Sequence, residues 1–319
     1  MNAMKKHLRD YLALRRGLGF ELGRAESRLR SFLASMAVKR ANRITTMLAV
    51  EFALRADHRS ASTQAGCLSA IRGFAQYLSG IDPKTEVPPA GLIRQERRPH
   101  PYIYSDDEIS RLIDAAGRHP STPRYALKPV TLQCVLGLLA VTGMRLTEAL
   151  NLKPEDIDWS QGAATIGRAK FQKIRLVPLH ESTLRQLRAY AKRRDRFFTE
   201  RPWRRPVNRF FVSTHGGPLT SNDIGADFRT LTRHLGLRAP GASHGPRIHD
   251  LRHRFAVATL LRWYRSGKDV DRLMPVLSTY LGHVFITGTY WYLTCTPELM
   301  AAAGKRLETR WKGGRHGQD

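Results

Sequence analysis

The chain has 319 residues, of which 42% are hydrophobic and 25% charged, and its 53 Lys and Arg against 27 Asp and Glu give a formal net charge of +26. This length is sufficient for two domains with separate cores, and the composition excludes an intrinsically disordered protein. A charge this positive favours a polyanionic partner, because each phosphate that a cation neutralises releases condensed counterions. We therefore expect a nucleic-acid partner, ahead of an anionic membrane or a charge that serves only solubility.

The composition also predicts a protein of the reducing cytoplasm without a membrane anchor. The longest apolar run, Cys134 to Met144, is too short to span a bilayer and is typical of a buried helix. Charged residues interrupt the apolar positions of the N-terminus, and no cleavage-like site follows them, so we expect no signal peptide. The cysteines Cys67, Cys134 and Cys295 are odd in number and form no CxxC pair, which argues against a disulfide framework and against structural zinc.

Residues 1–95 are expected to form a helical domain. Their apolar residues recur with the helical period of 3.6, at Leu8, Tyr11 and Leu12, at Leu29, Phe32 and Leu33, and at Leu68, Ile71, Phe74 and Leu78. A stretch with prolines at 83, 88, 89, 99 and 101 follows and keeps no period, so we interpret it as an extended basic linker that contains the domain boundary.

Residues 96–319 are expected to form a second, mostly helical domain with a small antiparallel sheet. Ser105 followed by Glu108 is a capping box that begins its first helix. The apolar helix through Leu139 comes next, and β-branched runs around 163–179, separated by a short basic turn, predict a hairpin. Helical patterns return at 221–235, 250–265, 270–281 and 297–308. The fold class is thus mainly α with a small antiparallel β-sheet.

Six residues of this domain are candidates for chemistry, although each alone has an ordinary structural explanation: Arg145, Lys170, His249, Arg252, His283 and Tyr292. A single arginine is usually paired at the surface, and a lysine in a turn usually faces solvent. His249 and Arg252 stand three residues apart and would share one helix face, but this spacing is common by chance. Tyr292 lies in an aromatic cluster, which is typical of core packing.

The joint pattern is far more specific. The motifs TGMRLTEAL, AKFQKIRLVPL, HDLRHRFA and LGH, with a tyrosine nine residues after the last histidine, occur in this order between residues 100 and 310. Together they resemble the tyrosine recombinase (phage integrase) family, and the C-terminal segment is most similar to recombinases carried by transposons. The resemblance implies a helical core-binding (SAM-like) DNA-binding domain at residues 1–95 and a catalytic domain at 96–319.

The chemistry of this family requires these residue types. When a phenol attacks a DNA phosphodiester, negative charge accumulates on the non-bridging oxygens, and guanidinium groups such as Arg145 and Arg252 can neutralise it with forked hydrogen bonds. Tyr292 is the expected nucleophile, and His249 is the expected general base that accepts its proton. The resemblance implies that Lys170 protonates the leaving 5′ oxygen. Neither a cofactor nor a metal is expected.

Two further residues complete the expected site. His283 is predicted to donate a hydrogen bond to a non-bridging oxygen of the phosphate. Glu148 follows Arg145 by one turn, and we expect it to orient that arginine, with a purely structural role as the alternative.

Several assignments depend on register or remain open. Counting nine residues from His283 selects Tyr292 over Tyr290, and residues two apart on a helix point in nearly opposite directions, so Tyr290 is expected on the packing side. Alignment of RLVPL selects Lys170 over Lys173. His253 and Arg254 are left open between a DNA-facing and a structural role.

Two further segments of the second domain carry expectations about structure and assembly. The 30 residues between Arg252 and His283 exceed what simpler family members need, with the excess around 262–275. A longer loop there can be accommodated without moving the site, so only the local helix boundaries stay open. Leu299, Met300 and Leu307 are expected either to fill a groove on a neighbouring subunit or to fold back on their own chain.

The sequence therefore predicts a metal- and ATP-independent site-specific recombinase that cleaves and rejoins double-stranded DNA through a 3′-phosphotyrosyl intermediate and moves a mobile element. It would act as a synaptic homotetramer or with sister recombinases, in the cytoplasm and at the nucleoid. Two alternatives remain: a type IB topoisomerase, which has the same chemistry but rejoins the same strand, and a non-catalytic DNA-binding factor on the same scaffold.

Overall fold

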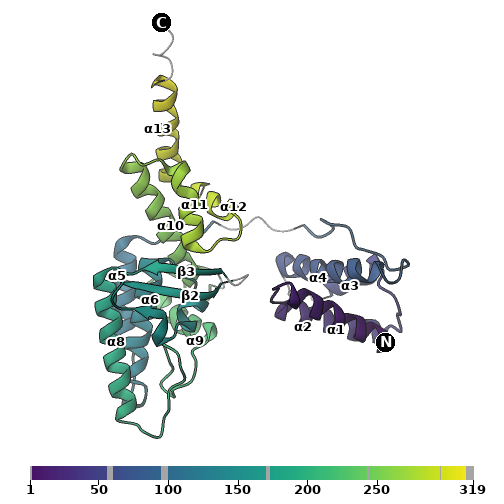
Figure 1. Cartoon of the computed structure of the whole chain (residues 1–319), viewed down its shortest axis with the longest axis horizontal. Helices are drawn as coiled ribbons and strands as arrows, with labels where there is room; N and C mark the ends of the chain where they lie inside the picture. Colours follow the sequence, from purple (N-terminus) through teal and green to yellow (C-terminus); the bar gives the residue numbers. More distant parts are fainter. Residues whose placement is uncertain are drawn as a thin grey trace. The chain divides into compact units, whose positions relative to one another are not determined.

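The chain folds into two compact units, residues Met1–Pro99 and His100–Asp319 (Figure 1). The computed structural model describes residues 2–55, 60–94, 100–169, 173–242, 244–294 and 296–313. The division lies in the proline-containing linker, close to the predicted boundary at residues 95 and 96.

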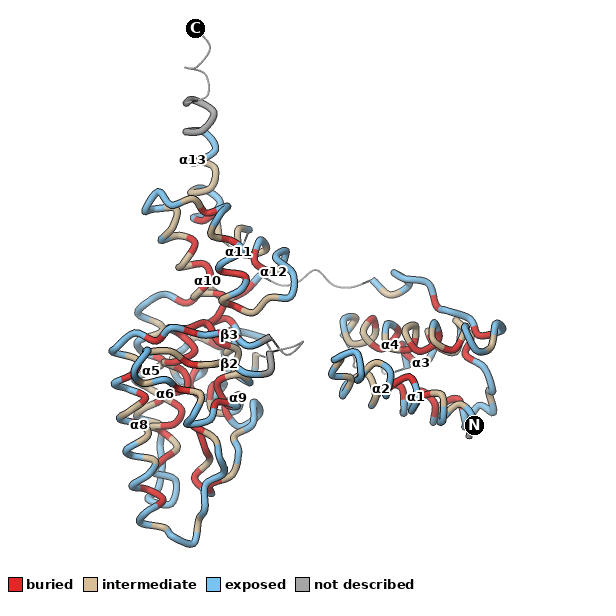
Figure 2. Tube along the Cα trace, viewed as in Figure 1, coloured by how far each residue is buried: buried red, intermediate tan, exposed pale blue. Residues whose placement is uncertain are grey.

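The first unit is a bundle of helices. It contains α1 (Asn2–Gly17), α2 (Gly23–Val38), α3 (Thr46–Leu54) and α4 (Ala61–Ser79). Figure 2 shows the buried side of these helices turned toward one another. The apolar residues that predicted the helices all belong to this core: Leu8, Tyr11, Leu12, Leu29, Phe32, Leu33, Leu68, Ile71, Phe74 and Leu78.

Part of the predicted linker packs onto this bundle. Arg72 of α4 donates hydrogen bonds to the carbonyl oxygens of Pro88 and Pro89, at 2.8 and 2.9 Å. Glu86 accepts a hydrogen bond of 2.7 Å from the backbone N–H of Thr46 at the start of α3. The first half of this proline-containing stretch is therefore a strap on the first unit rather than a free spacer.

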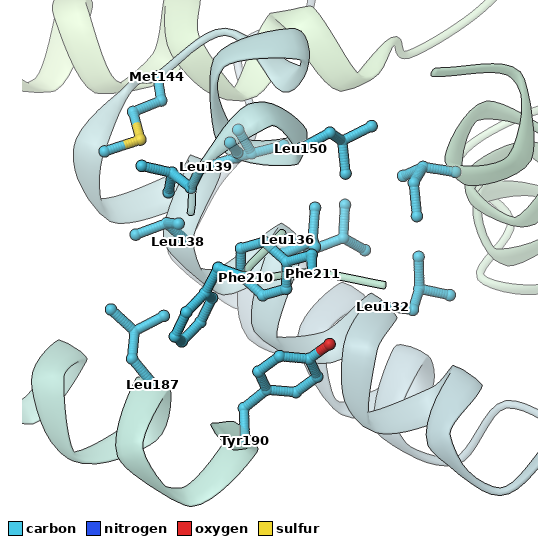
Figure 3. Close-up of a cluster of buried hydrophobic side chains, with 14 of the residues drawn as sticks. Leu132, Leu136, Leu138, Leu139, Met144, Leu150, Leu187, Tyr190, Phe210 and Phe211 are labelled. Atoms are coloured by element: carbon cyan, nitrogen blue, oxygen red, sulfur yellow. The ribbon is translucent and has the colours of Figure 1, made fainter. Parts of the chain in front are cut away.

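The core of the second unit surrounds the apolar helix α6 (Leu127–Thr142). Helices α5 (Asp106–Gly117), α8 (Glu181–Thr199) and α10 (Ile248–Arg265) pack against it. Figure 3 shows how leucines of α6 meet Leu187 and Tyr190 of α8 and two phenylalanines, Phe210 and Phe211, from the loop after α8. The stretch Pro123–Thr142 passes a length-and-hydropathy test for a membrane span, but these contacts identify it as the core helix of a folded unit.

The predicted hairpin is part of a three-stranded antiparallel sheet in the order β1-β2-β3. The pair β2 (Ala163–Ala169) and β3 (Lys173–Pro178) confirms the prediction, whereas the two-residue strand β1 (Ile157–Asp158) is too short to leave a pattern in the sequence. Arg175 lies opposite Ile166 in the register of the hairpin. The helix α9 (Ser221–His234) and the short helix α7 (Leu146–Asn151) complete this part of the unit.

The C-terminal helices enclose a second small core. They are α10, α11 (Val270–Leu281), α12 (Thr287–Tyr290), a 3₁₀ turn (Trp291–Thr294) and α13 (Pro297–Gly313). The helix boundaries left open after Arg252 agree with the helical pattern of the sequence, because α10 continues to Arg265 and α11 begins at Val270. Only a short turn separates the two helices.

The fold class predicted from the sequence, mainly helical with one small antiparallel sheet, is confirmed in the part of the chain that the structure describes.

We predict that Leu136→Ala lowers the free energy of unfolding of the second unit by about 2–5 kcal/mol, because Leu136 is fully buried and its truncation leaves a cavity. All 5 tryptophans lie between residues 159 and 311, so their fluorescence during denaturant unfolding reports on this unit. The matched control is Val141→Ala on the same helix, where the side chain is 53% exposed and the expected change is within about 0.5 kcal/mol. Equal effects of the two substitutions would contradict this packing.

Candidate active site

The candidate site is built around the C-terminal end of α11. Gly282 ends this helix in the left-handed conformation, with φ of 65°. Three arginines from different elements donate to three successive carbonyl oxygens there: Arg175 to Tyr280 at 2.7 Å, Arg252 to Leu281, and Arg145 to Gly282 at 3.0 Å. The last carbonyls of a helix have no partners within the helix and carry the negative end of its dipole. They therefore attract the three cations to one place.

Arg145 is positioned by the turn between α6 and α7. Gly143 ends α6 with φ of 62°, and an added Cβ would lie 2.6 Å from the ring of Phe255, so this sharp turn requires glycine. Arg145 is the N-cap of α7, and its side chain is 34% exposed, which leaves the guanidinium accessible from solvent.

Glu148 contacts Arg145 as predicted. Its Oε1 accepts a hydrogen bond of 2.8 Å from the Arg145 guanidinium, and its Oε2 accepts one of 2.8 Å from the backbone N–H of the same arginine. Burial alone would raise the pKa of Glu148, but hydrogen bonds from Arg175 and Arg145 outweigh it and hold that pKa below its ordinary value. The carboxylate is therefore charged, and it orients Arg145.

Arg175, on β3, is a residue that the sequence reasoning missed. Its Nη1 and Nη2 donate to the two oxygens of Glu148 at 3.1 and 2.7 Å, and its side chain is 7% exposed. The available signal was its place in the motif AKFQKIRLVPL, but nothing in a strand sequence distinguishes a buried arginine from an exposed one.

Arg252 is buried, at 2% exposure. It donates a hydrogen bond of 2.9 Å to the carbonyl oxygen of Gly143, in addition to the one to Leu281. It thereby joins α10 to the ends of α6 and α11. Burial and then the neighbouring charge of Arg145 lower its pKa to about 10. This arginine is thus still a cation at neutral pH.

His249 lies one turn before Arg252 on α10 and keeps an exposed edge. Burial of much of the ring and then the positive charges of Arg252 and Arg145 lower its pKa to about 4. Because solvent reaches the ring, an approaching anion would counteract part of this depression. At neutral pH the imidazole is uncharged and able to accept a proton.

Tyr292 is buried, at 2% exposure, and its hydroxyl lies 3.3 Å from Nδ1 of His253. The ring of His283 stacks on the ring of Tyr292, with the centroids 6.0 Å apart. His253 is itself 1% exposed, which favours the structural one of its two open roles. It follows His249 by one helical turn, and their rings meet edge to face at 4.8 Å.

The remaining predicted residues lie as follows. Nδ1 of His283 is 2.7 Å from the hydroxyl oxygen of Thr289, a contact that fixes the orientation of the imidazole. Tyr290 is 42% exposed, so the expectation that it packs in the core is wrong: the helical turn ends at this residue, and the 3₁₀ turn that follows directs Tyr292 inward. Arg254 forms an ion pair with Asp106 of α5. Lys170 lies outside the described residues.

The structure thus brings Arg145, Glu148, His249, Arg252, His283 and Tyr292 together. Within the described ranges no group of three or more His, Cys, Asp or Glu side chains could hold a metal ion. The groove of about 520 Å³ between α6 and α8 contains none of these residues.

A comparison with known proteins identifies the family of the chain. The sequence pattern of the phage integrase family matches residues 104–298. The chain belongs to this family. The recombinase is 44% identical over 317 residues to y4rB of Sinorhizobium fredii, which is named as an integrase/recombinase, and the match covers 98% of this chain and 99% of that relative. It is 30% identical over 235 residues to tyrosine recombinase XerD of Rhizobium meliloti, covering 73% and 70% of the two chains.

Solved structures share the fold of the recombinase. The Tn1549 transposon integrase in complex with transposon right end DNA superposes with a TM-score of 0.66 at 16% identity, covering 95% of this chain and 98% of that one. A lambda integrase dimer bound to a COC′ core site gives a TM-score of 0.60 at 18% identity, covering 92% and 96%. Identities this low show the common fold alone.

The recombinase should show His249 titrating near pH 4, well below the ordinary pKa of about 6.5, in an NMR titration whose resonance is assigned with His249→Gln. Arg145→Gln removes a positive neighbour, so it should raise this pKa. The unfolded chain binds a proton at His249 near pH 6.5 and the folded chain only near 4. Stability should therefore fall as the pH drops through this interval. A titration midpoint of His249 near pH 6.5 in the DNA-free protein would contradict the proposal that burial and the two arginines lower its pKa.

Proposed function

We propose that this recombinase cleaves and rejoins DNA strands at specific sites through a 3′-phosphotyrosyl intermediate, in the movement of a mobile element. The observation that carries the proposal is the convergence of two arginines, two histidines and Tyr292 at the end of α11. Such a set matches the needs of a phosphodiester that is attacked by a phenol, since cations must balance the charge that develops on the non-bridging oxygens. The name of the relative y4rB, integrase/recombinase, supports the same conclusion.

The two arginines serve this reaction in different ways. Arg145 is the more accessible of the two, and two of the five N–H donors of its guanidinium are engaged in hydrogen bonds to described residues. It can therefore offer further donors to a phosphate. Arg252 lies deeper and supplies fixed positive charge close to the nucleophile, since an ionised Tyr292 raises the pKa of Arg252.

Proton transfer is assigned to a base and an acid. His249 is neutral at physiological pH, as a general base must be. We propose that it accepts the proton of the Tyr292 hydroxyl when the phenol attacks the phosphate. His283 would donate a hydrogen bond to a non-bridging oxygen with its ring fixed by Thr289. Lys170 retains, from the family resemblance, the role of protonating the leaving 5′ oxygen.

The buried phenol implies a conformational step. At 2% exposure, Tyr292 cannot reach a phosphate on a bound duplex without a rearrangement of the segment 287–294. That segment consists of two helical pieces of four residues each, which have little intrinsic stability. DNA binding would therefore exchange the contact between Tyr292 and His253 for a contact with the phosphate.

The overall reaction exchanges one phosphoester for another. The attack forms the bond from the Tyr292 oxygen to phosphorus and releases a 5′-hydroxyl, and a 5′-hydroxyl from a partner duplex reverses the attack. Because bond energy is retained, the chemistry needs neither ATP nor a metal.

We further propose that double-stranded DNA is bound by both units and that two duplexes are held by a homotetramer, or together with sister recombinases, at the nucleoid in the cytoplasm. The beginning of α13 folds back on its own chain, where Leu299 is fully buried, while Met300 and Leu307 are 57% and 63% exposed. The exposed pair is the part of this helix that can reach a neighbouring subunit.

Two other functions are separable from this one by experiment. A type IB topoisomerase would promptly relax supercoiled DNA that carries no special site, whereas a site-specific recombinase would not. A non-catalytic DNA-binding factor would bind duplexes firmly without forming a covalent adduct.

Tyr292→Phe is expected to bind DNA normally but to form no covalent adduct, because the nucleophilic oxygen is absent. The substrates are duplexes tiled across the DNA that flanks the gene, each with a nick that lets the released strand diffuse away, and adducts are detected by denaturing gel electrophoresis. The matched control, Tyr290→Phe, removes an exposed hydroxyl two residues away and should react like the wild type. Exchanged results would refute the assignment of the nucleophile.

Arg145→Gln is expected to slow adduct formation by roughly hundredfold or more, because a preorganised donor to the transition state is lost. Its DNA affinity, measured by fluorescence anisotropy, should fall much less, since many other phosphate contacts remain. Arg188→Gln is the control, because Arg188 is also a partly exposed arginine paired with a glutamate, Glu181, but lies on α8. An affinity loss as large as the loss of cleavage would indicate a binding role for Arg145 instead.

A further inference from the structure

We propose that Arg175 is a positioning residue of the cleavage reaction, which holds Glu148 so that Arg145 stays directed toward the scissile phosphate. This inference rests on the proposed function and extends it to a residue outside the predicted catalytic set. Arg175 is 7% exposed, whereas Arg145 is 34% exposed. The buried guanidinium is thus placed to act through its neighbours rather than on DNA.

The carboxylate of Glu148 is shared between two arginines. Arg175 donates to both of its oxygens, at 3.1 and 2.7 Å, in the forked geometry that binds a carboxylate most firmly. The Arg145 side chain donates to one of these oxygens only, at 2.8 Å. Arg175 thus takes the two-point contact with Glu148, and the guanidinium of Arg145 is left with a single-point contact.

Loss of Arg175 would change this division. Glu148 would then be free to form the forked pair with Arg145 itself, since a carboxylate and a guanidinium favour that geometry. The forked pair would draw into an internal ion pair the same N–H groups that a phosphate needs. Arg175 therefore prevents Glu148, the partner that orients Arg145, from competing with the substrate.

Arg175 also holds the helix end that precedes His283. Its Nε donates 2.7 Å to the carbonyl oxygen of Tyr280, and an added Cβ on Gly282 would lie 2.8 Å from its Nη1. The guanidinium thus lies directly against the backbone that ends α11. A lysine has one ammonium group and cannot bridge Glu148 and Tyr280 with the same set of planar donors.

The test compares single-turnover adduct formation by Arg175→Gln and the wild type on the nicked duplex that yields adduct. We expect a loss of about tenfold to hundredfold in rate, as for other small misplacements of a catalytic group, with DNA affinity changed less than about threefold. Arg175→Lys should recover only part of the rate. The control is Arg194→Gln, because the Arg194 side chain is also mostly shielded, at 12% exposure, and donates a hydrogen bond of 2.8 Å to the carbonyl oxygen of Phe210 on the α8 side of the unit. The rate of this variant should equal that of the wild type.

Two readouts separate positioning from mere support of the fold. In the double variant Arg145→Gln/Arg175→Gln, the second change should add little, because Arg145 is the group that Arg175 serves. In duplexes with a methylphosphonate at the scissile position, a methyl group replaces one charged oxygen, so less positive charge is required. One stereoisomer should reduce the loss of cleavage rate caused by Arg145→Gln. On that same stereoisomer, the loss of rate caused by Arg175→Gln should also become smaller.

The inference would be overturned if the rate loss in the double variant equalled the product of the two single losses. It would also be overturned if Arg175→Gln reacted at the wild-type rate, or if its rate loss were the same on both methylphosphonate isomers as on the normal phosphodiester. Absence of adduct from the wild-type protein on every tiled duplex would instead refute the proposed function. Tryptophan fluorescence during denaturant unfolding shows whether each variant remains folded.

Discussion

The candidate site depends on one electrostatic arrangement, in which the last carbonyl oxygens of α11 collect three arginine side chains. Guanidinium groups repel one another, and a fold that gathers them must supply negative charge or dipoles. The C-terminal end of a helix provides unpaired carbonyls and partial negative charge, and Glu148 adds a full one. The site can therefore exist before DNA arrives, already positive where a phosphate is to bind, and its cations need little reorganisation during the reaction.

The three arginines of this arrangement differ in burial and therefore in the role we propose for each. Arg175 and Arg252 are largely withdrawn from solvent and connect β3, α10 and the end of α6 to α11, while Arg145 remains accessible. A buried charged group that loses its partner destabilises the folded protein. Removal of one of these contacts therefore weakens the others. Stability and the proposed phosphate binding thus depend on one network in this recombinase, and substitutions within it are expected to couple rather than to add.

The proposed nucleophile lies in a different environment from the arginines. Tyr292 lies in the small core of the C-terminal helices, against His253 and His283, while the arginines stand ready at the end of α11. In the proposed mechanism, this core contact would separate DNA recognition from strand cleavage, because the segment 287–294 would have to leave its packed position first. Such a step would give the protein a means of committing to cleavage only on a suitable duplex.

The sequence by itself determined the fold class, the helices with clear apolar periodicity, the hairpin and the residue types of the candidate site. These are local patterns of spacing, and the family motifs carry them in linear order. Only the tertiary structure decided that Arg175 shares Glu148 with Arg145, that His253 contacts Tyr292 and that Tyr290 is exposed. These features depend on contacts between segments distant in sequence and on how a helical turn tightens into a 3₁₀ turn, and neither leaves a periodic trace in the chain.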